Sequence, residues 1–317
     1  MSLPSSPSNL SLDVDHTAGD SELPDTLVAC VQMEPRLGQR AQNLEESMVT
    51  IEMAAARGAS VIVLPELVSS GYAFKSRSEA FAAAEPVSDS VSLRAWSEAA
   101  SRLGVHLVAG FAEREGERLY NSAAIMSPRG LLGLYRKLHL WGDEQLFFEP
   151  GNLGLPVFDT DFGRIAAVIC YDGWFPEVYR RLSEQHVDLV CMPTNWVPMP
   201  QQPAGMPAMA NTLAMAAAHS NAMAIACANR VGVERGQAFI GQSLIVNADG
   251  WPLAGPASID RPELLLARIN IAQARRGRQL NAFNHLLRDR RADLFGACSF
   301  NEAAPRGLPA AAPSFER

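Results

Sequence analysis

The sequence predicts a single α/β domain whose sheets mix parallel and antiparallel strand pairs. Short apolar runs alternate with longer segments in which apolar residues recur at helical spacing, a pattern typical of α/β folds. No Gly/Ser-rich linker divides the chain from residue 26 onward, which favours one domain over two. Two stretches, 120–136 and 239–269, hold apolar runs without an intervening helix, and this indicates antiparallel pairing.

The individual elements follow from the same alternation. "TLVACVQM" at 26–33 predicts a strand, Leu44, Met48 and Ile51 predict a helix, and "ASVIVLPE" at 59–66 predicts a buried strand, so the chain opens with a β-α-β unit. Further helices are expected near 90–103, from Pro176 and near 206–220, and further strands near 105–112, 120–127, 131–136, 164–170, 187–192, 222–228 and 239–247. The turn signal "NADG" predicts that the last of these strands continues into a hairpin.

Composition excludes several classes of function. The net charge of -7 and the absence of long basic runs argue against binding to nucleic acid or to an anionic membrane, so a small-molecule partner is expected. Five widely spread cysteines without a C-x-x-C pair or a Cys/His cluster predict neither a disulfide framework nor a metal site. Four of them are interpreted as small buried hydrophobic residues, namely Cys30, Cys191, Cys227 and Cys298.

Both ends of the chain differ from the predicted domain. Residues 1–24 are rich in Ser, Pro and Asp and lack the apolar core of a signal peptide, so a disordered leader is expected. The folded domain is predicted to cover 25–298, followed by a flexible tail at 299–317. Asn, His and Ser interrupt the Ala/Met run near 204–228, so no membrane span is expected and the protein is predicted to be cytoplasmic.

Three predicted strands end in an ionisable side chain. Glu66 follows "VIVLP", Lys137 follows "LLGLYR", and Cys170 closes "IAAVIC". Side chains just past the carboxyl ends of strands face the ligand crevice of an open α/β sheet. Because Pro176 suits the first turn of a helix, Cys170 is expected at a strand-to-helix elbow, where free backbone N–H groups can bind an oxyanion. Taken singly, a buried cysteine, a capping glutamate and a surface lysine are the alternatives.

These motifs together resemble the Glu-Lys-Cys set of the nitrilase superfamily of carbon-nitrogen hydrolases. "LPE" with Glu66, "YRKLHL" with Lys137 and "ICYDGWFPE" with Cys170 occur in the family's order, and the resemblance covers about residues 26–295. "EQLFFEPG" resembles the segment that carries a second active-site glutamate, which would be Glu144. The resemblance implies a four-layer α-β-β-α sandwich with two mixed sheets, usually paired into a dimer through helices of two subunits.

The expected chemistry divides among these residues. A cysteine with a pKa of about 8.5 is mostly protonated at neutral pH, so a base must take its proton. Burial would raise the pKa of Glu66, which suits this residue to accept that proton and to return it to departing ammonia. Lys137 and the backbone N–H of Tyr171 would stabilise the tetrahedral oxyanion before water attacks the thioester. The resemblance implies that Glu144 positions the substrate or Lys137, or assists proton transfer; it implies no cofactor.

Other chemistries fit the sequence less well. His139 suggests a Cys-His pair, but the segment that follows Lys137 is leaving its strand. "GQSLI" lacks the second glycine of a G-x-S-x-G elbow, and "SSG" lacks the lysine spacing of the Ser-Ser-Lys amidases. Hydrolysis or hydration of a small nitrile by the same triad, N-carbamoyl hydrolysis and an idle subunit that only binds remain the alternatives.

The substrate is predicted to be a small, uncharged carboxamide. "CYDGWFPE" is similar to the amidase and carbamoylase branches of the family, whereas true nitrilases typically carry Trp-Glu after the cysteine. Enzymes of the family that cleave N-carbamoyl amino acids tend to place arginines at the positions of Gly173 and Trp174, and this chain does not. The predicted substrate-binding residues are Tyr72, Trp141, Trp174, Asn195 and Trp196.

The segment at 275–296 predicts how the chain assembles. It mixes arginines with apolar residues such as Leu280, Phe283 and Leu294, more apolar surface than a chain leaves in water. In the family, such a segment commonly crosses to a partner subunit. We therefore expect a homodimer or a larger homo-oligomer, with the segment folded back on its own subunit as the alternative.

Overall fold

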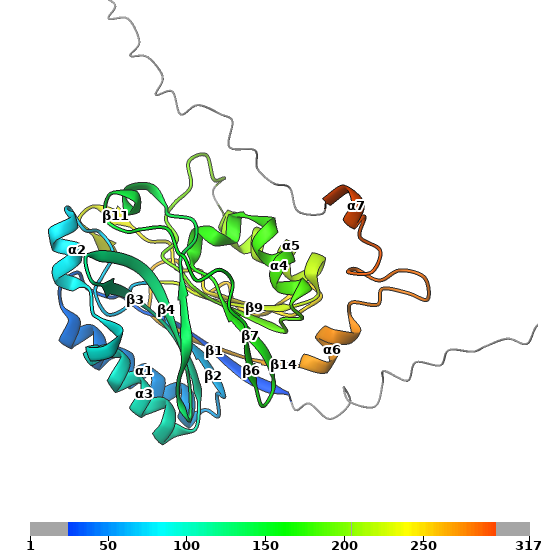
Figure 1. Ribbon diagram of the computed structural model, residues 1–317, viewed down its shortest axis with the longest axis horizontal. Helices are drawn as coiled ribbons and strands as arrows, with labels where there is room; N and C mark the ends of the chain where they lie inside the picture. Colours follow the sequence, from blue (N-terminus) through cyan, green and yellow to red (C-terminus); the bar gives the residue numbers. More distant parts are fainter. Residues whose placement is uncertain (1–24, 204, 296–317) are drawn as a thin grey trace, which may run out of the picture.

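The computed structural model describes residues 25–203 and 205–295. Two six-stranded mixed sheets lie face to face at the centre of the molecule, and helices cover the outer face of each (Figure 1). The predicted α-β-β-α sandwich is therefore confirmed. The predicted leader at 1–24, the tail at 299–317 and Cys298 lie outside the described residues.

The first sheet carries parallel strands at its centre and antiparallel strands at its edges. Its strands, in spatial order, are β14 (Glu263–Ile269), β1 (Thr26–Gln32), β2 (Val61–Val63), β3 (His106–Glu115), β4 (Arg118–Ser127) and β5 (Gly130–Arg136). Strands β1, β2 and β3 are parallel, whereas β14, β4 and β5 pair antiparallel with their neighbours. The stretch 120–136 thus forms the antiparallel pair that the sequence predicts.

The second sheet repeats this arrangement. Its strands, in spatial order, are β13 (Pro252–Ala254), β12 (Leu244–Val246), β9 (Ala224–Ala228), β8 (Leu189–Pro193), β7 (Gly163–Ala167) and β6 (Phe158–Thr160). Here β7, β8 and β9 are parallel, and the "NADG" turn joins the antiparallel pair β12 and β13. A separate two-stranded ribbon contains β10 (Val233–Glu234) and β11 (Gln237–Ala238).

Helices occupy both outer layers. On the first sheet lie α1 (Arg40–Ala56) and α3 (Val91–Leu103), and on the second α4 (Pro176–Glu184) and α5 (Met209–Asn221) (Figure 1). Shorter elements are α2 (Arg77–Ala83), α6 (Ile271–Arg276), α7 (Ala292–Phe295), η1 (Val87–Asp89), η2 (Gly142–Leu146) and η3 (Cys170–Trp174). Ser90 caps α3 by accepting from Leu93 N–H, and Pro176 occupies the first turn of α4 as predicted.

The side chains of β1 show why the sheet needs cover on both faces. Val28 and Cys30 belong to the apolar core between the two sheets, whereas Ala29 and Val31 pack in the core shared with α1 and α3. Successive side chains of a strand point to opposite faces, so a strand that is buried on both sides reads as a continuous apolar run. This burial explains why "TLVACVQ" contains no solvent-facing alternation.

Two predicted strands end earlier than the sequence indicates, and both shortened ends carry candidate residues. Strand β2 stops at Val63, so Glu66 lies in the following turn, where Leu67 adopts a positive φ of 49°. Strand β7 stops at Ala167, so Cys170 opens the short helix η3 rather than closing a strand. The apolar composition of both runs continues past the point where strand pairing ends. Helices α2 and α6 and strand β6 were not anticipated.

Candidate active site

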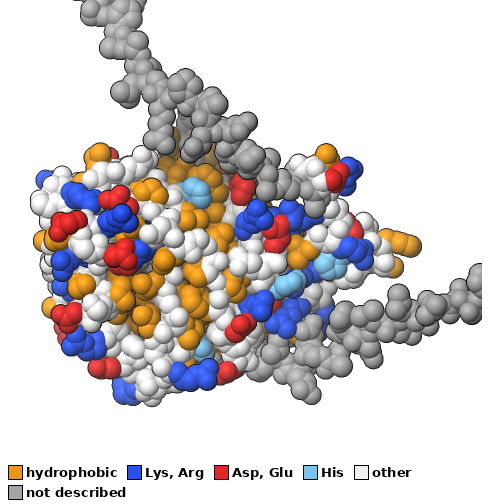
Figure 2. Space-filling model, viewed as in Figure 1, with side chains coloured by type: hydrophobic (Ala, Val, Ile, Leu, Met, Phe, Trp, Pro, Cys, Tyr) orange, Lys and Arg blue, Asp and Glu red, His pale blue; other side chains and the backbone are white. Residues whose placement is uncertain are grey.

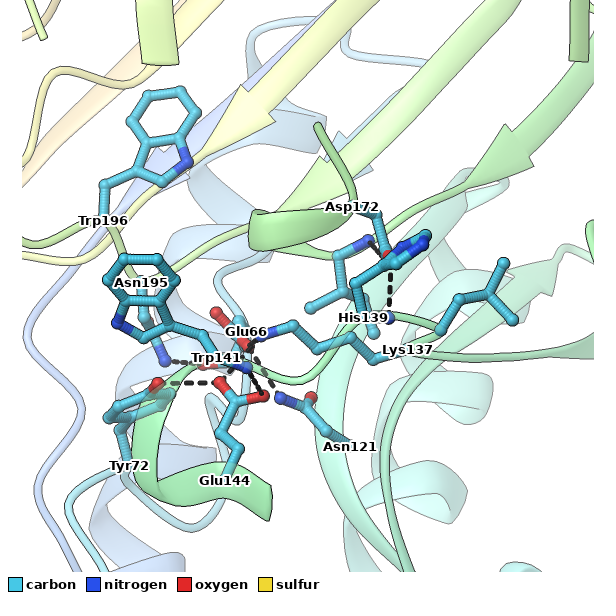
Figure 3. A network of polar contacts seen from close by, with 12 residues as sticks. Glu66, Tyr72, Asn121, Lys137, His139, Trp141, Glu144, Asp172, Asn195 and Trp196 are labelled. Atoms are coloured by element: carbon cyan, nitrogen blue, oxygen red, sulfur yellow. Dashed lines mark hydrogen bonds and ion pairs between the residues drawn. The ribbon is translucent and has the colours of Figure 1, made fainter. Parts of the chain in front are cut away.

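Glu66, Lys137 and Glu144 meet beyond the strands of the first sheet, where Glu66 follows the central strand β2 and Glu144 lies in η2 (Figure 3). Lys137, directly after β5, donates to Glu66 Oε1 at 2.6 Å and to Glu144 Oε1 at 2.7 Å. All three side chains are buried. The structure therefore brings three of the four predicted catalytic side chains into one hydrogen-bonded cluster.

Further side chains support this cluster, and Asn121 among them was missed. Asn121 on β4 donates to Glu66 Oε1 at 2.6 Å, and its backbone carbonyl accepts from Lys137 N–H at 2.8 Å. The hydroxyl of Tyr72 donates to Glu144 Oε1 at 2.7 Å. A lone asparagine within the buried strand "LYNSAAI" is the signal that could have identified Asn121, because a buried amide needs a polar partner.

Gly110 on β3 allows the Glu66 turn to approach the sheet. A Cβ atom at Gly110 would lie 2.6 Å from Glu66 Cα, Leu67 N and Pro65 O. All three are backbone atoms, which cannot move aside as the end of a flexible side chain can. The position of Glu66 thus depends on the absence of a side chain on the neighbouring strand.

Cys170 comes from the second sheet and faces this cluster. It has a positive φ of 46°, a strained conformation for a non-glycine residue, and is only 8% exposed. Asn195, which follows β8, donates through Nδ2 to the backbone carbonyl of Glu66 at 3.0 Å and so links the two sheets at the site. Strand–turn–helix geometry therefore presents the thiol at the junction of the sheets, as the elbow prediction requires.

Asp172 stabilises the elbow from inside. Its fully buried carboxylate accepts from Ile169 N–H at 3.0 Å, from the Tyr135 hydroxyl at 2.7 Å and from His139 N–H at 3.0 Å. The His139 ring bonds the same carboxylate through Nδ1 at 2.8 Å and stacks on Phe175. His139 is thus engaged with Asp172, which leaves the Cys-His alternative without geometric support.

Burial and neighbouring charges together set the pKa values at the site. It raises the pKa of Glu66 to about 7, although Lys137 acts in the opposite direction. Burial alone would lower the pKa of Lys137, but Glu144 and Glu66 outweigh it and the pKa is raised, so the ammonium stays charged. Burial and the charge of Glu66 raise the pKa of the Cys170 thiol. The resting thiol is therefore protonated, and a base that titrates near neutrality lies close to it.

A small pocket opens beside Cys170. Its cavity volume is about 20 Å³, little more than one water molecule needs, so the site suits only a small ligand. Its lining consists of Trp141, Cys170, Tyr171, Trp174, Asn195, Trp196, Val197 and Met199. Four of the five predicted substrate-binding residues are in this lining, whereas Tyr72 contacts Glu144 instead. Val197 and Met199 were not predicted.

Several buried polar atoms near the site have no hydrogen-bond partner among the described residues. They are Glu66 Oε2, Thr194 Oγ1, Asn195 Oδ1 and Trp196 Nε1. Buried polar groups are nearly always satisfied, so an unpaired group marks a place where a ligand can supply the partner. Of these, the acceptor Asn195 Oδ1 and the donor Trp196 Nε1 belong to residues that line the Cys170 pocket.

The described residues, 25–203 and 205–295, show neither a metal site nor a membrane-spanning helix. They contain no group of three or more His, Cys, Asp or Glu side chains arranged to hold a metal ion. Within the same ranges, no helix is long and apolar enough to cross a membrane.

Comparison with known proteins identifies the family of the chain. A family model described as carbon-nitrogen hydrolase matches residues 27–279. A nitrilase from Pyrococcus abyssi is 38% identical over 268 residues, which are 84% of this chain and 98% of the relative. An N-carbamoylputrescine amidase from Arabidopsis thaliana is 31% identical over 77% of this chain and 86% of its own.

A solved amidase structure is similar along almost its whole length. It comes from Nesterenkonia sp., and its active-site cysteine carries the acetamide moiety of fluoroacetamide. The TM-score is 0.71 at 25% identity, with 86% of this chain and 97% of that one covered. Because the family model spans most of the chain and the Pyrococcus abyssi relative is 38% identical over 84% of it, the protein belongs to the carbon-nitrogen hydrolase family and is a carbon-nitrogen hydrolase.

Proposed function

We propose that the protein hydrolyses a small, uncharged carboxamide to the carboxylic acid and ammonia through a thioester on Cys170. One observation carries the proposal. A buried glutamate with a pKa of about 7, paired with a buried lysine, lies at the junction of the sheets where Cys170 opens η3. These are a base, a cation and a nucleophile in the arrangement that acyl transfer needs.

In the first half of the reaction, Glu66 takes the thiol proton as Sγ attacks the amide carbon. The tetrahedral oxyanion accepts from the Lys137 ammonium and from the Tyr171 backbone N–H. Glu66 then donates its proton to the amide nitrogen, the C–N bond breaks and ammonia leaves. The acyl group remains on Cys170 as a thioester.

In the second half, Glu66 acts as a base again. It takes a proton from water, whose oxygen attacks the thioester carbon, and the second oxyanion uses the same donors. Collapse releases the acid, and the proton on Glu66 returns to the thiolate. Glu144 accepts from both Lys137 and Tyr72, so its role is to hold the ammonium in place through both steps.

The pocket supports an uncharged acyl group. None of its described lining residues is an acid, lysine or arginine, and Trp141, Tyr171 and Trp174 form an aromatic wall with ring centroids 4.9 and 6.0 Å apart. A charged acyl group would lose its hydration there without gaining a partner. Asn195 Oδ1, a buried acceptor, suits the amide N–H₂ of the substrate.

A nitrile is the second candidate substrate, because the Pyrococcus abyssi relative is a nitrilase. Attack by Cys170 on a nitrile carbon gives a thioimidate that the same residues can hydrolyse. Yields of acid, amide and ammonia from matched amides and nitriles, such as propionamide and propionitrile, distinguish the two substrates.

We also propose a homo-oligomeric, cytoplasmic enzyme whose catalytic domain lies within 25–298. Leu280, Phe283 and Leu294 are 54%, 84% and 60% exposed in the single chain, which supports burial against a second subunit. Figure 2 shows hydrophobic side chains at the outer end of the segment that follows α6, at the right of the view.

The decisive test is the mass of the intact protein after brief exposure to a panel of small amides and nitriles. Trapped acyl-enzyme adds the mass of the acyl group, and peptide mapping is expected to locate it on Cys170. Cys170→Ala should form no adduct and release no ammonia, while Cys191→Ala, at a buried position away from the pocket, should do both. Turnover by Cys170→Ala would overturn the nucleophile assignment.

A further inference from the structure

A buried ion pair behind the active site holds the loop that carries Tyr72. Arg230, 1% exposed, donates through Nη1 to Glu234 Oε1 at 3.0 Å and through Nη2 to the carbonyl of Pro35 at 2.6 Å. Its guanidinium also lies over the ring of Phe239, 4.1 Å from the centroid. The Arg230 cation, which is itself in contact on three sides, therefore fixes the position of Glu234 on β10.

The two carboxylate oxygens of Glu234 have different partners. Oε1 pairs with Arg230, whereas Oε2 accepts from the backbone N–H groups of Tyr72 and Ala73, at 2.8 and 2.7 Å. One oxygen therefore holds the anchor and the other holds the loop. Gly71 makes this approach possible, because a Cβ atom there would lie 2.8 Å from Glu234 Oε1.

The loop in turn directs a side chain at the catalytic cluster. Tyr72 packs its ring edge-on against Phe239, with centroids 5.8 Å apart, and donates its hydroxyl to Glu144 Oε1. The same oxygen of Glu144 accepts from Lys137. A continuous series of contacts therefore runs from Arg230 through Glu234 and Tyr72 to Glu144, and ends at the ammonium that faces the oxyanion.

We propose that Glu234 is a positioning residue of the active site, which acts on Glu144 and Lys137 through the hydroxyl of Tyr72. Because Glu234 accepts from two consecutive backbone N–H groups, it fixes both the position and the direction of the Tyr72 side chain. Neither Glu234 nor Tyr72 is in the lining of the Cys170 pocket. Their loss is therefore expected to change kcat more than KM. The inference rests on the proposed role of Glu144 in the amide reaction.

Glu234→Gln separates positioning from folding. The charge of Arg230 attracts the amide oxygen more strongly than two neutral N–H groups do, so the amide nitrogen turns toward Tyr72 and Ala73 and repels them. Arg230 keeps a partner, and the fold is retained. We expect kcat for propionamide to fall about tenfold, the size of effect of losing a hydrogen bond to a charged group, with KM changed less than about twofold.

A double-mutant cycle with Tyr72→Phe tests the route. Tyr72→Phe alone is expected to lower kcat about tenfold. If Glu234 acts through that hydroxyl, Glu234→Gln causes no further loss in the Tyr72→Phe background. Equal fold-losses in both backgrounds, or no loss from Glu234→Gln in the wild-type background, would overturn the proposal.

Glu79→Gln provides the matched control. Glu79 also accepts from a backbone N–H of this loop, that of Lys75 at 2.7 Å, and pairs with an arginine, Arg235, but it does not contact Tyr72. We expect its kcat to equal that of the wild type. A loss as large as that of Glu234→Gln would show a general loosening of the loop and would overturn the specific role.

The rate at which iodoacetamide alkylates Cys170 gives a second readout that needs no amide turnover. It is expected to fall in Glu234→Gln and Tyr72→Phe alike, and not in Glu79→Gln. If the wild-type protein released no ammonia from any amide, the proposed function would fail, while this series would still test the link from Glu234 to the thiol. Unchanged alkylation in Glu234→Gln would break that link.

Discussion

Lys137 Nζ lies 2.6 Å from Glu66 Oε1, and both side chains are fully shielded from solvent. An ion pair of this kind contributes little to stability, because desolvation of two charges offsets their attraction. Its value is chemical: it keeps the ammonium charged while Glu66 remains a base that titrates near neutrality.

The pH dependence of turnover should report Glu66. Its pKa is raised from 4.5 to about 7, and the base must be ionised to take the thiol proton. We therefore expect kcat/KM for an amide to rise with pH and to reach half its plateau near pH 7. Initial rates of ammonia release between pH 5 and 9 measure this limb, and a midpoint near 4.5 would contradict the assignment.

Lys137→Met should separate the stability of the pair from its chemistry. Two buried carboxylates, Glu66 and Glu144, would then face each other without a cation, at a cost of about 3 kcal/mol. The pKa of Glu66 would rise further, so the folded state would hold its proton more tightly than the unfolded chain. Stability is consequently lost as pH rises, and urea unfolding should show a larger deficit at pH 8 than at pH 5.

Gly110→Ala should lower activity without removing a catalytic side chain. The new Cβ would meet the backbone of Pro65 to Leu67 and displace Glu66. We expect kcat/KM to fall at least about tenfold and unfolding free energy to drop by about 2 kcal/mol. Gly104→Ala, strained at φ of 70° at the end of α3, is the control that should lose stability and keep its activity.

Asp172→Asn should destabilise the elbow. An amide cannot accept from Ile169 N–H, Tyr135 OH and His139 together, because one of its two ends is a donor. The expected loss is about 2 kcal/mol in unfolding free energy, with slower alkylation of Cys170. Tyr135→Phe, which removes one donor only, should cost about half as much.

Phe283→Ser tests the assembly. The side chain is 84% exposed in the single chain, so its removal should not weaken the isolated subunit. If the segment after α6 packs on a partner, light scattering should show a smaller average mass than for the wild type at the same concentration. An unchanged mass would favour the alternative in which the segment stays on its own subunit. One contact favours this alternative: Arg275, at the start of the segment, donates to Asp188 of the same chain.

Sequence patterns predicted the elements whose signals are local. The apolar runs of β1, β3 and β8 and the proline of α4 carry their own evidence of structure. The ends of the strands could not be predicted in this way. "VIVLPE" and "IAAVIC" stay apolar after strand pairing stops, and only tertiary contacts decide where that pairing ends. The face-to-face packing of the two sheets was predicted only through the family resemblance. The period and spacing of apolar residues show that one face of a strand is buried, but they do not show which element packs against it.

The site divides in the same way. Glu66, Lys137 and Cys170 were identified because ionisable groups after apolar strands are conspicuous, and Glu144 because "EQLFFEPG" resembles a segment of the family. Asn121 and Glu234 were not, because each acts through a partner that is distant in sequence: Asn121 lies 55 residues from Glu66 and Glu234 lies 162 from Tyr72. Tyr72 was predicted to be a substrate-binding residue, but in the structure its hydroxyl donates a hydrogen bond to Glu144.

The two sheets contribute unlike halves of the site. Glu66 and Lys137 follow strands of the first sheet, whereas Cys170 and Asn195 follow strands of the second, and side-chain hydrogen bonds such as those from Asn195 to Glu66 and from Tyr135 to Asp172 join the two. The side chains of either sheet alone would supply a base without a nucleophile or a nucleophile without a base. Catalytic turnover is therefore a sensor of docking between layers: during gentle denaturation, ammonia release should cease while far-ultraviolet circular dichroism is still near its native value.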